Sequence, residues 1–281
     1  MTVLGVLHPG SMGAAVAGQA AFGGYEVLWC PTGRSEATMR RAGQQGLKAV
    51  ASVGELTARA DIILSICPPA NAEQVAAEVA ACGFSGTYVD GNAVAPGTVE
   101  RIGGLMRRSG AVVVDGAIVG SPPSTSKNTR LYLSGPQDAL SVVAALFADS
   151  AVHPYPLAGG LGRASALKLA YSSYQKSSRV LAAVAYALAA EHGVEGELLD
   201  IAQQRTSSYL AETDYFPKVA ARSWRWGPEM QEVAQAMREA GLPSELAEAS
   251  ATAMSRWTEF RDSPPSLSQA IASLHNESSE S

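Results

Sequence analysis

The chain has 281 residues, of which 47% are hydrophobic and 17% charged, with a formal net charge of −5. This composition predicts a globular protein that is long enough for two domains and a substantial core. The acidic balance and the lack of a long basic block argue against nucleic acid as a main partner. We also expect no metal site, no membrane span and a cytoplasmic location, because the cysteines form no CxxC pair and no apolar run could cross a bilayer.

A glycine-containing turn opens the chain. A short apolar run ends before residues 8–13, His-Pro-Gly-Ser-Met-Gly, and the apolar pattern then resumes with helical spacing. Gly10 would let a diphosphate approach the main chain, and Gly13 would let the helix pack closely on the strand. The full fingerprint has a third glycine where His8 stands. The stretch predicts a dinucleotide-binding turn, with Gly10, Ser11 and Met12 as its candidate contacts.

Strands and helices alternate through the first part of the chain. Further strands are expected at residues 26–30, 61–67, 86–90 and 111–115, with an edge-like strand at 130–134. A helix is expected at 35–45, with Ser35 as its N-cap. This alternation is typical of a doubly wound parallel sheet. We therefore predict an α/β fold whose N-terminal Rossmann domain covers residues 1–160.

The second part is expected to be all-helical. Residues 163–192 contain no proline or glycine and predict a helix of about thirty residues, roughly 45 Å long. Its half at 180–190 is apolar all round, so a second copy of the chain is expected to cover it, or else the later helices wrap it. Those helices are expected at about 197–211, 217–223, 228–240 and 244–260. We predict a substrate and dimerisation domain over residues 161–262 and a disordered Ser/Pro-rich tail over 263–281.

The loop after the second strand indicates which cofactor is bound. An NAD site normally has an acidic residue there for the ribose 2′-OH, whereas an NADP site has arginine and small hydroxyl groups around a 2′-phosphate. Here the first acidic residue is delayed to Glu36, and Arg34 offers a bidentate fork for a phosphate. The other candidate contacts are Thr32, Gly33 and Ser35. The loop predicts NADP(H), unless Arg34 is simply a solvated side chain.

Three strand ends supply further candidates, because ligands of open α/β sheets lie outside the carboxyl ends of the strands. Cys67 and Pro68 follow one strand, and we expect Pro68 to shape the loop beside the cofactor. Asn92 follows the next strand and is expected to bond the ribose or the carboxamide. A third strand leads to Gly120 and Ser121, which are candidate substrate contacts.

The first half of the long helix carries a polar stripe that includes Lys168, Tyr171, Ser172 and Gln175. Their spacing puts most of them along one helix face. A lysine near a nicotinamide can exchange a proton with a substrate oxygen or nitrogen. We predict that Lys168 is the acid/base, that Tyr171 and Ser172 assist it, and that Gln175 contacts the substrate. A solvated helix face is the alternative.

These residues together resemble the superfamily of β-hydroxyacid dehydrogenases and 6-phosphogluconate dehydrogenase, up to about residue 260. Members open with Gly-Leu-Gly-x-Met-Gly, where this chain has residues 8–13, and carry Asp-x-Ser-Thr-x-x-Pro, matched by residues 90–96. Their Gly-x-Gly-x-x-x-Lys-x-x-x-Asn is matched by residues 162–172, with Ser172 in place of the asparagine. The resemblance implies that Lys168 is the general acid/base and that the helical domain forms an intertwined homodimer.

The resemblance also leaves more than one reaction open. The Ser-Gly-Gly that grips the substrate carboxylate in hydroxyacid enzymes aligns with residues 119–121, so that grip is weakened or shifted. The segments 115–118 and 131–135 resemble imine reductases, which favour NADPH but usually lack the lysine. The first hypothesis is an NADP(H)-dependent oxidoreductase acting on a small hydroxy or keto substrate. The second is an imine or ketimine reductase with Tyr171 as proton donor, and the third is a catalytically silent NADP-binding protein.

Overall fold

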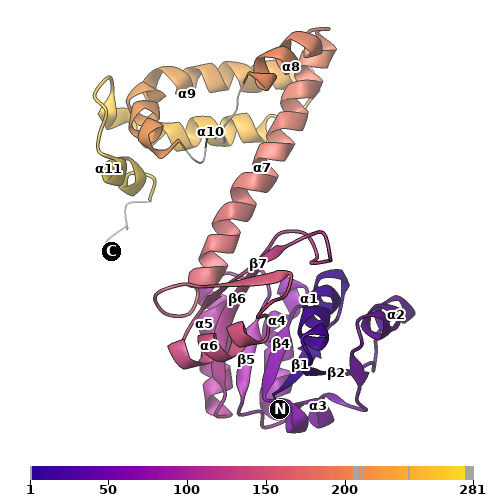
Figure 1. Cartoon of the computed structure of the whole chain (residues 1–281). Helices are drawn as coiled ribbons and strands as arrows, with labels where there is room; N and C mark the ends of the chain where they lie inside the picture. The colour runs from indigo at the N-terminus through magenta and orange to yellow at the C-terminus, as the bar shows by residue number, and fades with distance from the viewer. Residues whose placement is uncertain (1, 205–208, 210–211, 240, 276–281) are drawn as a thin grey trace. The chain divides into compact units, whose positions relative to one another are not determined.

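The computed structural model of the chain describes residues 2–204, 209, 212–239 and 241–275 (Figure 1). The chain divides into two compact units, Met1–Ser172 and Ser173–Ser281. The division falls inside a long helix, somewhat after the boundary expected at residue 160. Each unit is described by itself below.

The first unit is built on an eight-stranded sheet of order β3-β2-β1-β4-β5-β6-β7-β8 (Figure 1). The strands are β1 (Val3–Leu7), β2 (Glu26–Trp29), β3 (Lys48–Ala49), β4 (Ile62–Ser65), β5 (Thr87–Asp90), β6 (Val112–Val119), β7 (Thr129–Ser134) and β8 (Val152–Pro156). The first six strands run parallel, β7 is antiparallel to β6, and β8 is parallel to β7. The order of the first six is that of a doubly wound dinucleotide-binding sheet, which confirms the predicted fold class.

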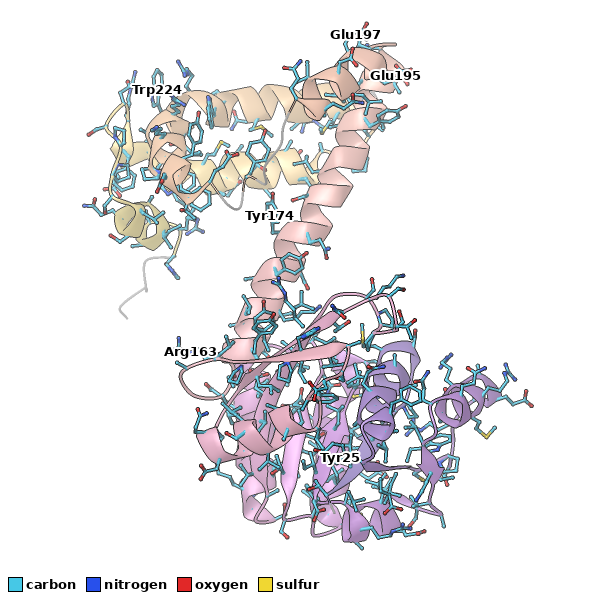
Figure 2. All side chains as sticks on the ribbon, in the orientation of Figure 1. Tyr25, Arg163, Tyr174, Glu195, Glu197 and Trp224 are labelled. Carbon is cyan, nitrogen blue, oxygen red and sulfur yellow. The ribbon has the colours of Figure 1, made fainter. Side chains whose placement is uncertain are left out.

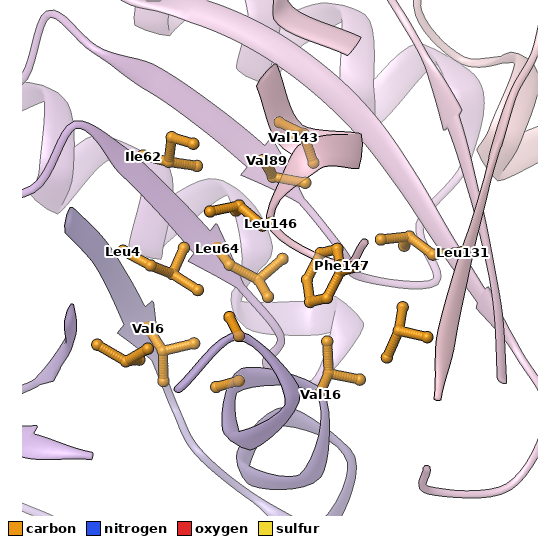
Figure 3. Packing of buried hydrophobic residues seen from close by; sticks show 14 of the residues in the cluster. Leu4, Val6, Val16, Ile62, Leu64, Val89, Leu131, Val143, Leu146 and Phe147 are labelled. Atoms are coloured by element: carbon orange, nitrogen blue, oxygen red, sulfur yellow. The ribbon is translucent and has the colours of Figure 1, made fainter. Parts of the chain in front are cut away.

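Helices cover both faces of this sheet. They are α1 (Ser11–Phe22), α2 (Glu36–Gln44), α3 (Val53–Arg59), α4 (Ala72–Ala81), α5 (Pro96–Arg108) and α6 (Gln137–Ala145). Side chains alternate between the faces, so in β4 Leu64 packs with α1 and α6 (Figure 3), and Ile63 packs with α3, α4 and α5. A central strand buried on both faces explains why β4 is apolar throughout.

The far edge of the sheet differs from the prediction. The strand expected to lie at the edge is β7, which has β6 on one side and β8 on the other. The true edge strand, β8, contains Pro154 and Pro156, and proline is accepted in a sheet mainly on edge strands because it lacks the N–H donor. Those prolines explain why the sequence did not indicate a strand there.

The second unit is helical in its described part. α7 (Arg163–Glu191) begins in the first unit, with Arg163 labelled in Figure 2, and is followed by α8 (Glu195–Gln203), α9 (Phe216–Glu239), α10 (Glu245–Ser255) and α11 (Leu267–Ala272). Short 3₁₀ turns lie at Pro69–Asn71, Thr213–Tyr215 and Thr258–Phe260. α9 and α10 pack around a small core of Ala234, Met237 and Ala247. Part of the helix expected at 197–211 (205–208 and 210–211) lies outside the described residues.

Two predictions for the second unit are wrong. The two helices expected at 217–223 and 228–240 form one helix, α9, which continues through Pro228. Gly227, the residue before this proline, faces α10: a Cβ added there would lie 3.9 Å from the Cβ of Met254, an ordinary contact distance. The tail is not disordered over Leu267–Ala272, because Ser266 and Gln269 form a capping box and Trp257 Nε1 donates to the Ala270 carbonyl at 2.7 Å.

Candidate active site

The turn between β1 and α1 has the shape that a dinucleotide phosphate requires. Gly10 is the N-cap of α1, and no side chain caps the helix there. The first turn of α1 also contains no acidic residue. A Cβ added at Gly13 would lie 2.9 Å from the His8 carbonyl oxygen, so only glycine lets the helix approach the turn this closely. The N-terminus of α1 therefore offers backbone N–H groups and a positive dipole end to an anion.

His8 is a strained residue in this turn. Its φ is 61°, in the left-handed region that a glycine would adopt without cost. Its Nδ1 is buried without a hydrogen-bond partner. Burial, and secondarily the charge of Arg34, lowers the pKa of His8 to about 4. The imidazole is therefore held neutral near neutral pH, beside a cation.

We expect the variant His8→Gly to gain more stability relative to the wild type near pH 5 than near pH 7.5. Because the folded pKa lies below the ordinary value of 6.5, the contribution of His8 to stability is present above about pH 6.5. It is lost as the pH falls toward about 4, and the glycine variant does not suffer that loss. Urea unfolding at both pH values measures the difference. His153→Gln changes an exposed histidine of β8 and is the control; an equal gain for His8→Gly at both pH values would contradict the prediction.

The loop after β2 presents Arg34 toward the glycine turn. The Arg34 N–H donates to the Pro31 carbonyl at 3.0 Å, and Gly33 has a φ of 72°, so the loop is a tight turn that needs glycine. The buried Nε of Arg34 has no hydrogen-bond partner. Arg34 also acts electrostatically on His8 after β1 and on Cys67 after β4. The positive charge of Arg34 is therefore felt at the carboxyl ends of β1 and β4.

The neighbours of Arg34 are already engaged. The Thr32 hydroxyl donates to the Ala51 carbonyl at 3.3 Å. The Ser35 hydroxyl accepts from the Thr38 N–H at 3.3 Å and so caps α2, as predicted. Glu36 forms a surface ion pair with Arg40 at 3.5 Å. The chain thus has an arginine and no acidic side chain where an NAD site normally has its acidic residue.

A cavity of about 220 Å³ lies at the carboxyl ends of the strands, starting beside the switch point between β1 and β4. It brings together predicted residues from five parts of the chain: Met12, Cys67, Asn92, Gly120 and Lys168. The rest of its lining is Ile66, Pro69, Gly91, Ala93, Ala117 and Ile118. The lysine is the single charged side chain among these residues. Such a cavity can hold a small, largely apolar group next to one proton donor.

Asn92 joins the loops after β4 and β5 below this cavity. Its Oδ1 accepts from the Cys67 N–H at 2.6 Å, and its Nδ2 donates to Ser65 Oγ at 3.3 Å and to Asp90 Oδ2 at 3.0 Å. Burial raises the pKa of Asp90 to about 6, although its hydrogen bonds with Asn92 oppose the rise. The amide of Asn92 therefore orders the cavity floor in addition to lining it.

A buried carboxylate anchors the helix that carries Lys168. Asp115 of β6 is fully buried; its Oδ1 accepts from Ser165 Oγ at 2.6 Å and its Oδ2 from the Ser165 N–H at 3.0 Å. Ser134 Oγ donates to the same carboxylate at 3.0 Å and accepts from the Ala164 N–H at 3.1 Å. These bonds satisfy first-turn N–H groups of α7 and place a negative charge at its positive end. Lys168 follows Ser165 by about one helical turn.

We expect Asp115→Asn to lower the free energy of unfolding by about 2 to 4 kcal/mol, because an amide cannot accept from Ser134 and Ser165 on both of its sides. Urea denaturation measures the loss. Asp138→Asn, at an exposed position in the first turn of α6, is the matched control and should cost about 0.5 kcal/mol or less. A loss as small for Asp115→Asn would contradict the anchoring role.

The remaining predicted residues lie outside this cavity. Tyr171, which is 38% exposed, lines a neighbouring cavity of about 350 Å³. Pro68 precedes the turn Pro69–Asn71, and the Ser121 carbonyl accepts a hydrogen bond from the Thr129 hydroxyl. Ser172 and Gln175 line neither cavity, and the site roles predicted for all these residues remain predictions.

The sequence did not single out Asp115 or the residues of the second cavity other than Tyr171. Asp115 is a strand-end residue whose partners lie 19 and 50 residues away, so only the fold reveals them. Arg130 and Tyr132 line the second cavity together with Asn128, and their alternation along β7 was the available signal that they share a face.

A doubly wound sheet, a glycine turn at a helix N-terminus and a cavity at the switch point define a dinucleotide-binding protein. Comparison with protein families agrees. Residues 3–159 match the NAD binding domain of 6-phosphogluconate dehydrogenase, and residues 189–257 match a domain of unknown function, DUF1932. The chain therefore belongs to the 6-phosphogluconate dehydrogenase-like superfamily, as its motifs indicated, and its first unit is that family's NAD binding domain.

Known proteins similar to the chain extend this comparison. An uncharacterised 28.5 kDa protein of Methanothermus fervidus is 30% identical over 180 residues, which is 64% of this chain and 68% of that protein. The imine reductase BcSIRED of Bacillus cereus has a TM-score of 0.77 at 17% identity, covering 99% of this chain and all of that one. The 3-hydroxyisobutyrate dehydrogenase of Mycobacterium tuberculosis has a TM-score of 0.64 at 16% identity, covering 98% and 100%. At these identities the two structures show a shared fold. Among the described residues, no helix is long and apolar enough to cross a membrane.

Proposed function

We propose that the protein is an NADP(H)-dependent oxidoreductase that transfers hydride between the nicotinamide and the carbon of a small hydroxy or keto substrate. The observation that carries the proposal is the position of Lys168. It lines the cavity at the carboxyl ends of the central strands together with Met12 of the glycine turn and Asn92 after β5. Lysine is an effective acid/base when it is held beside the reacting group.

The chain's residues fit NADP(H). The buried Arg34 Nε and His8 Nδ1 both lack hydrogen-bond partners, and both belong to the region between the glycine turn and the β2 loop. A 2′-phosphate would accept from the arginine, with Thr32, Gly33 and Ser35 beside it, while Gly10, Ser11 and Met12 present the N-terminus of α1 to the diphosphate. Cys67, Pro68 and Asn92 would border the cofactor farther along the sheet. When bound, the nicotinamide gives or accepts the hydride.

The protein residues handle the proton and hold the substrate. The Lys168 ammonium donates to the substrate oxygen during reduction and its amine accepts the proton during oxidation. Ser172 lies four residues along α7 from Lys168 and would orient the substrate, as would Tyr171. Gly120 and Ser121 would contact the substrate from the end of β6, and Gln175 from farther along α7.

The second candidate is an imine or ketimine reductase in which Tyr171 donates the proton. It is favoured by the position of Tyr171, which is 38% exposed and lines a cavity next to that of Lys168. Imine substrates need no carboxylate-binding loop, which is consistent with the absence of the Ser-Gly-Gly sequence at residues 119–121. The presence of Lys168 in the first cavity favours the hydroxy/keto reaction over this one.

The proposal is tested first by fluorescence titration with NADPH and with NADH, and then by a substrate panel. Selective binding of NADPH, followed by turnover of hydroxy or keto acids that requires Lys168, supports the first candidate. Turnover of cyclic imines that requires Tyr171 supports the second. Tight NADPH binding without hydride exchange across the panel would identify a catalytically silent binding protein and overturn both.

The proposal includes a cytoplasmic homodimer that forms through the helical domain. Leu181 and Tyr186, in the apolar half of α7, are 40% and 44% exposed in the single chain, which supports cover by a second copy. Light scattering on the purified protein measures the mass; a monomer at micromolar concentration would contradict this part of the proposal.

A further inference from the structure

We propose that Arg130 is the anchor for a carboxylate group of the substrate, in a subsite beside the Lys168 cavity. The proposal rests on the proposed function and names the feature that selects its substrate. The subsite is the second cavity, of about 350 Å³, and its lining is Val119, Asn128, Arg130, Tyr132, Leu167 and Tyr171. Arg130 is the one charged side chain in that lining.

The guanidinium of Arg130 is held in place by aromatic rings. Its Nη1 donates to the Tyr132 hydroxyl at 3.4 Å, and its Cζ lies 5.7 Å from the ring centroid of Tyr155. The two rings pack against each other with centroids 5.3 Å apart. Contact with aromatic faces restricts a side chain that would otherwise be mobile, so little conformational entropy is left to lose when an anion binds.

Arg130 has no carboxylate partner among the described residues. Arg40, Arg59, Arg101 and Arg238 each form an ion pair with a glutamate, and none of the ion pairs between described residues includes Arg130. An arginine fork matches a carboxylate with two parallel hydrogen bonds. Asn128, whose amide can donate hydrogen bonds, lines the same cavity.

The subsite adjoins the Lys168 cavity at three places. Val119 and Gly120 are consecutive in the chain, as are Leu167 and Lys168, and in each pair one residue lines each cavity. Ala117 of the first cavity is paired across the sheet with Tyr132 of the second. Directly opposed residues have Cβ atoms about 4.5 to 5.5 Å apart. A short chain can therefore place its hydroxyl or carbonyl carbon by Lys168 and its carboxylate by Arg130.

This arrangement compensates for the altered loop at residues 119–121. The loop holds one serine, Ser121, whose carbonyl is engaged by the Thr129 hydroxyl. A cation on the neighbouring strand can take over the electrostatic part of carboxylate binding, because Arg130 pairs across the ladder with Val119. The substrate class that follows is a short hydroxy or oxo acid with its carboxylate at some distance from the reacting carbon.

Calorimetric titration of the full chain tests the subsite, with and without saturating NADP⁺. The probes are 3-hydroxypropanoate, 4-hydroxybutanoate and 5-hydroxypentanoate, each beside its primary amide. We expect at least one acid to bind about tenfold or more tightly than its amide. Arg130→Gln should abolish the difference and Arg130→Lys should restore part of it, because lysine supplies the charge without the fork. Arg108→Gln, at an exposed position of α5, is the control and should leave the difference unchanged.

Each outcome separates the subsite from the proposed function. Normal NADPH binding with no preference for acids, or a preference that survives in Arg130→Gln, overturns the subsite and leaves the oxidoreductase proposal in place. Failure of every acid to bind also overturns the subsite. An Arg130-dependent preference in a chain that binds no NADPH supports the subsite and overturns the proposed function. Thermal unfolding of Arg130→Gln should match the wild type within about 2 °C, because the replaced side chain is exposed.

Discussion

Lys168→Met is expected to lower kcat by about 10²- to 10⁴-fold on whichever substrate the wild type reduces or oxidises with NADP(H). Methionine keeps the length and apolar stem of lysine and removes the ammonium group, so the cavity wall stays filled. The fall in kcat then measures what the ammonium group contributes to catalysis, through proton transfer and through its charge beside the substrate oxygen. The measurement is steady-state turnover followed through NADPH absorbance.

Three further readouts define this result. The affinity for NADPH should change less than about threefold, because the lysine is assigned to the substrate oxygen rather than to the cofactor phosphates. The pH profile of kcat should lose a limb that depends on Lys168 in the wild type. Lys48→Met, which removes an exposed lysine paired with Glu26 at 3.2 Å, should leave turnover unchanged. Full turnover by Lys168→Met would show that another group, with Tyr171 the first candidate, moves the proton.

Arg34→Ala is expected to weaken NADPH binding by about 10- to 100-fold and to leave NADH binding within about threefold of the wild type. The range corresponds to the loss of charge-assisted hydrogen bonds worth about 1.5 to 3 kcal/mol. The side chain has a buried Nε without a partner and acts on both His8 and Cys67. Parallel fluorescence titrations with the two cofactors measure the effect.

Arg40→Ala is the matched control, since Arg40 lies on α2 close to the same loop and forms a surface ion pair with Glu36. It should preserve the preference for NADPH. Higher salt should weaken NADPH binding by the wild type more than by Arg34→Ala, because the cation contributes a screened electrostatic attraction. Equal loss of both cofactors in Arg34→Ala would indicate damage to the loop, and a wild-type preference for NADH would overturn the NADP assignment.

The sequence by itself determined the class of fold and the cofactor turn. Parallel strands that are buried on both faces consist of continuous apolar residues, so β4 could be predicted from its local composition. Gly10, Gly13 and the Ser35 cap each interact with residues only a few positions away in the chain. Such local interactions can be predicted from the sequence alone. Lys168 was found through the helical spacing of the polar stripe on α7, and the resemblance to the superfamily implied its acid/base role.

Only the tertiary structure decided which residues meet. The anchoring of α7 by Asp115 joins residues 50 positions apart, and β8 forms a strand in spite of its prolines because it lies at an edge. Neighbouring positions of a helix point about 100° apart, so Leu167 and Lys168 line different cavities, and Tyr171 lies with Leu167. Helical spacing alone groups side chains that point toward either cavity into one polar stripe. The order of the strands in the sheet decides which strand borders each cavity, and it places Arg130 of β7 in the second one.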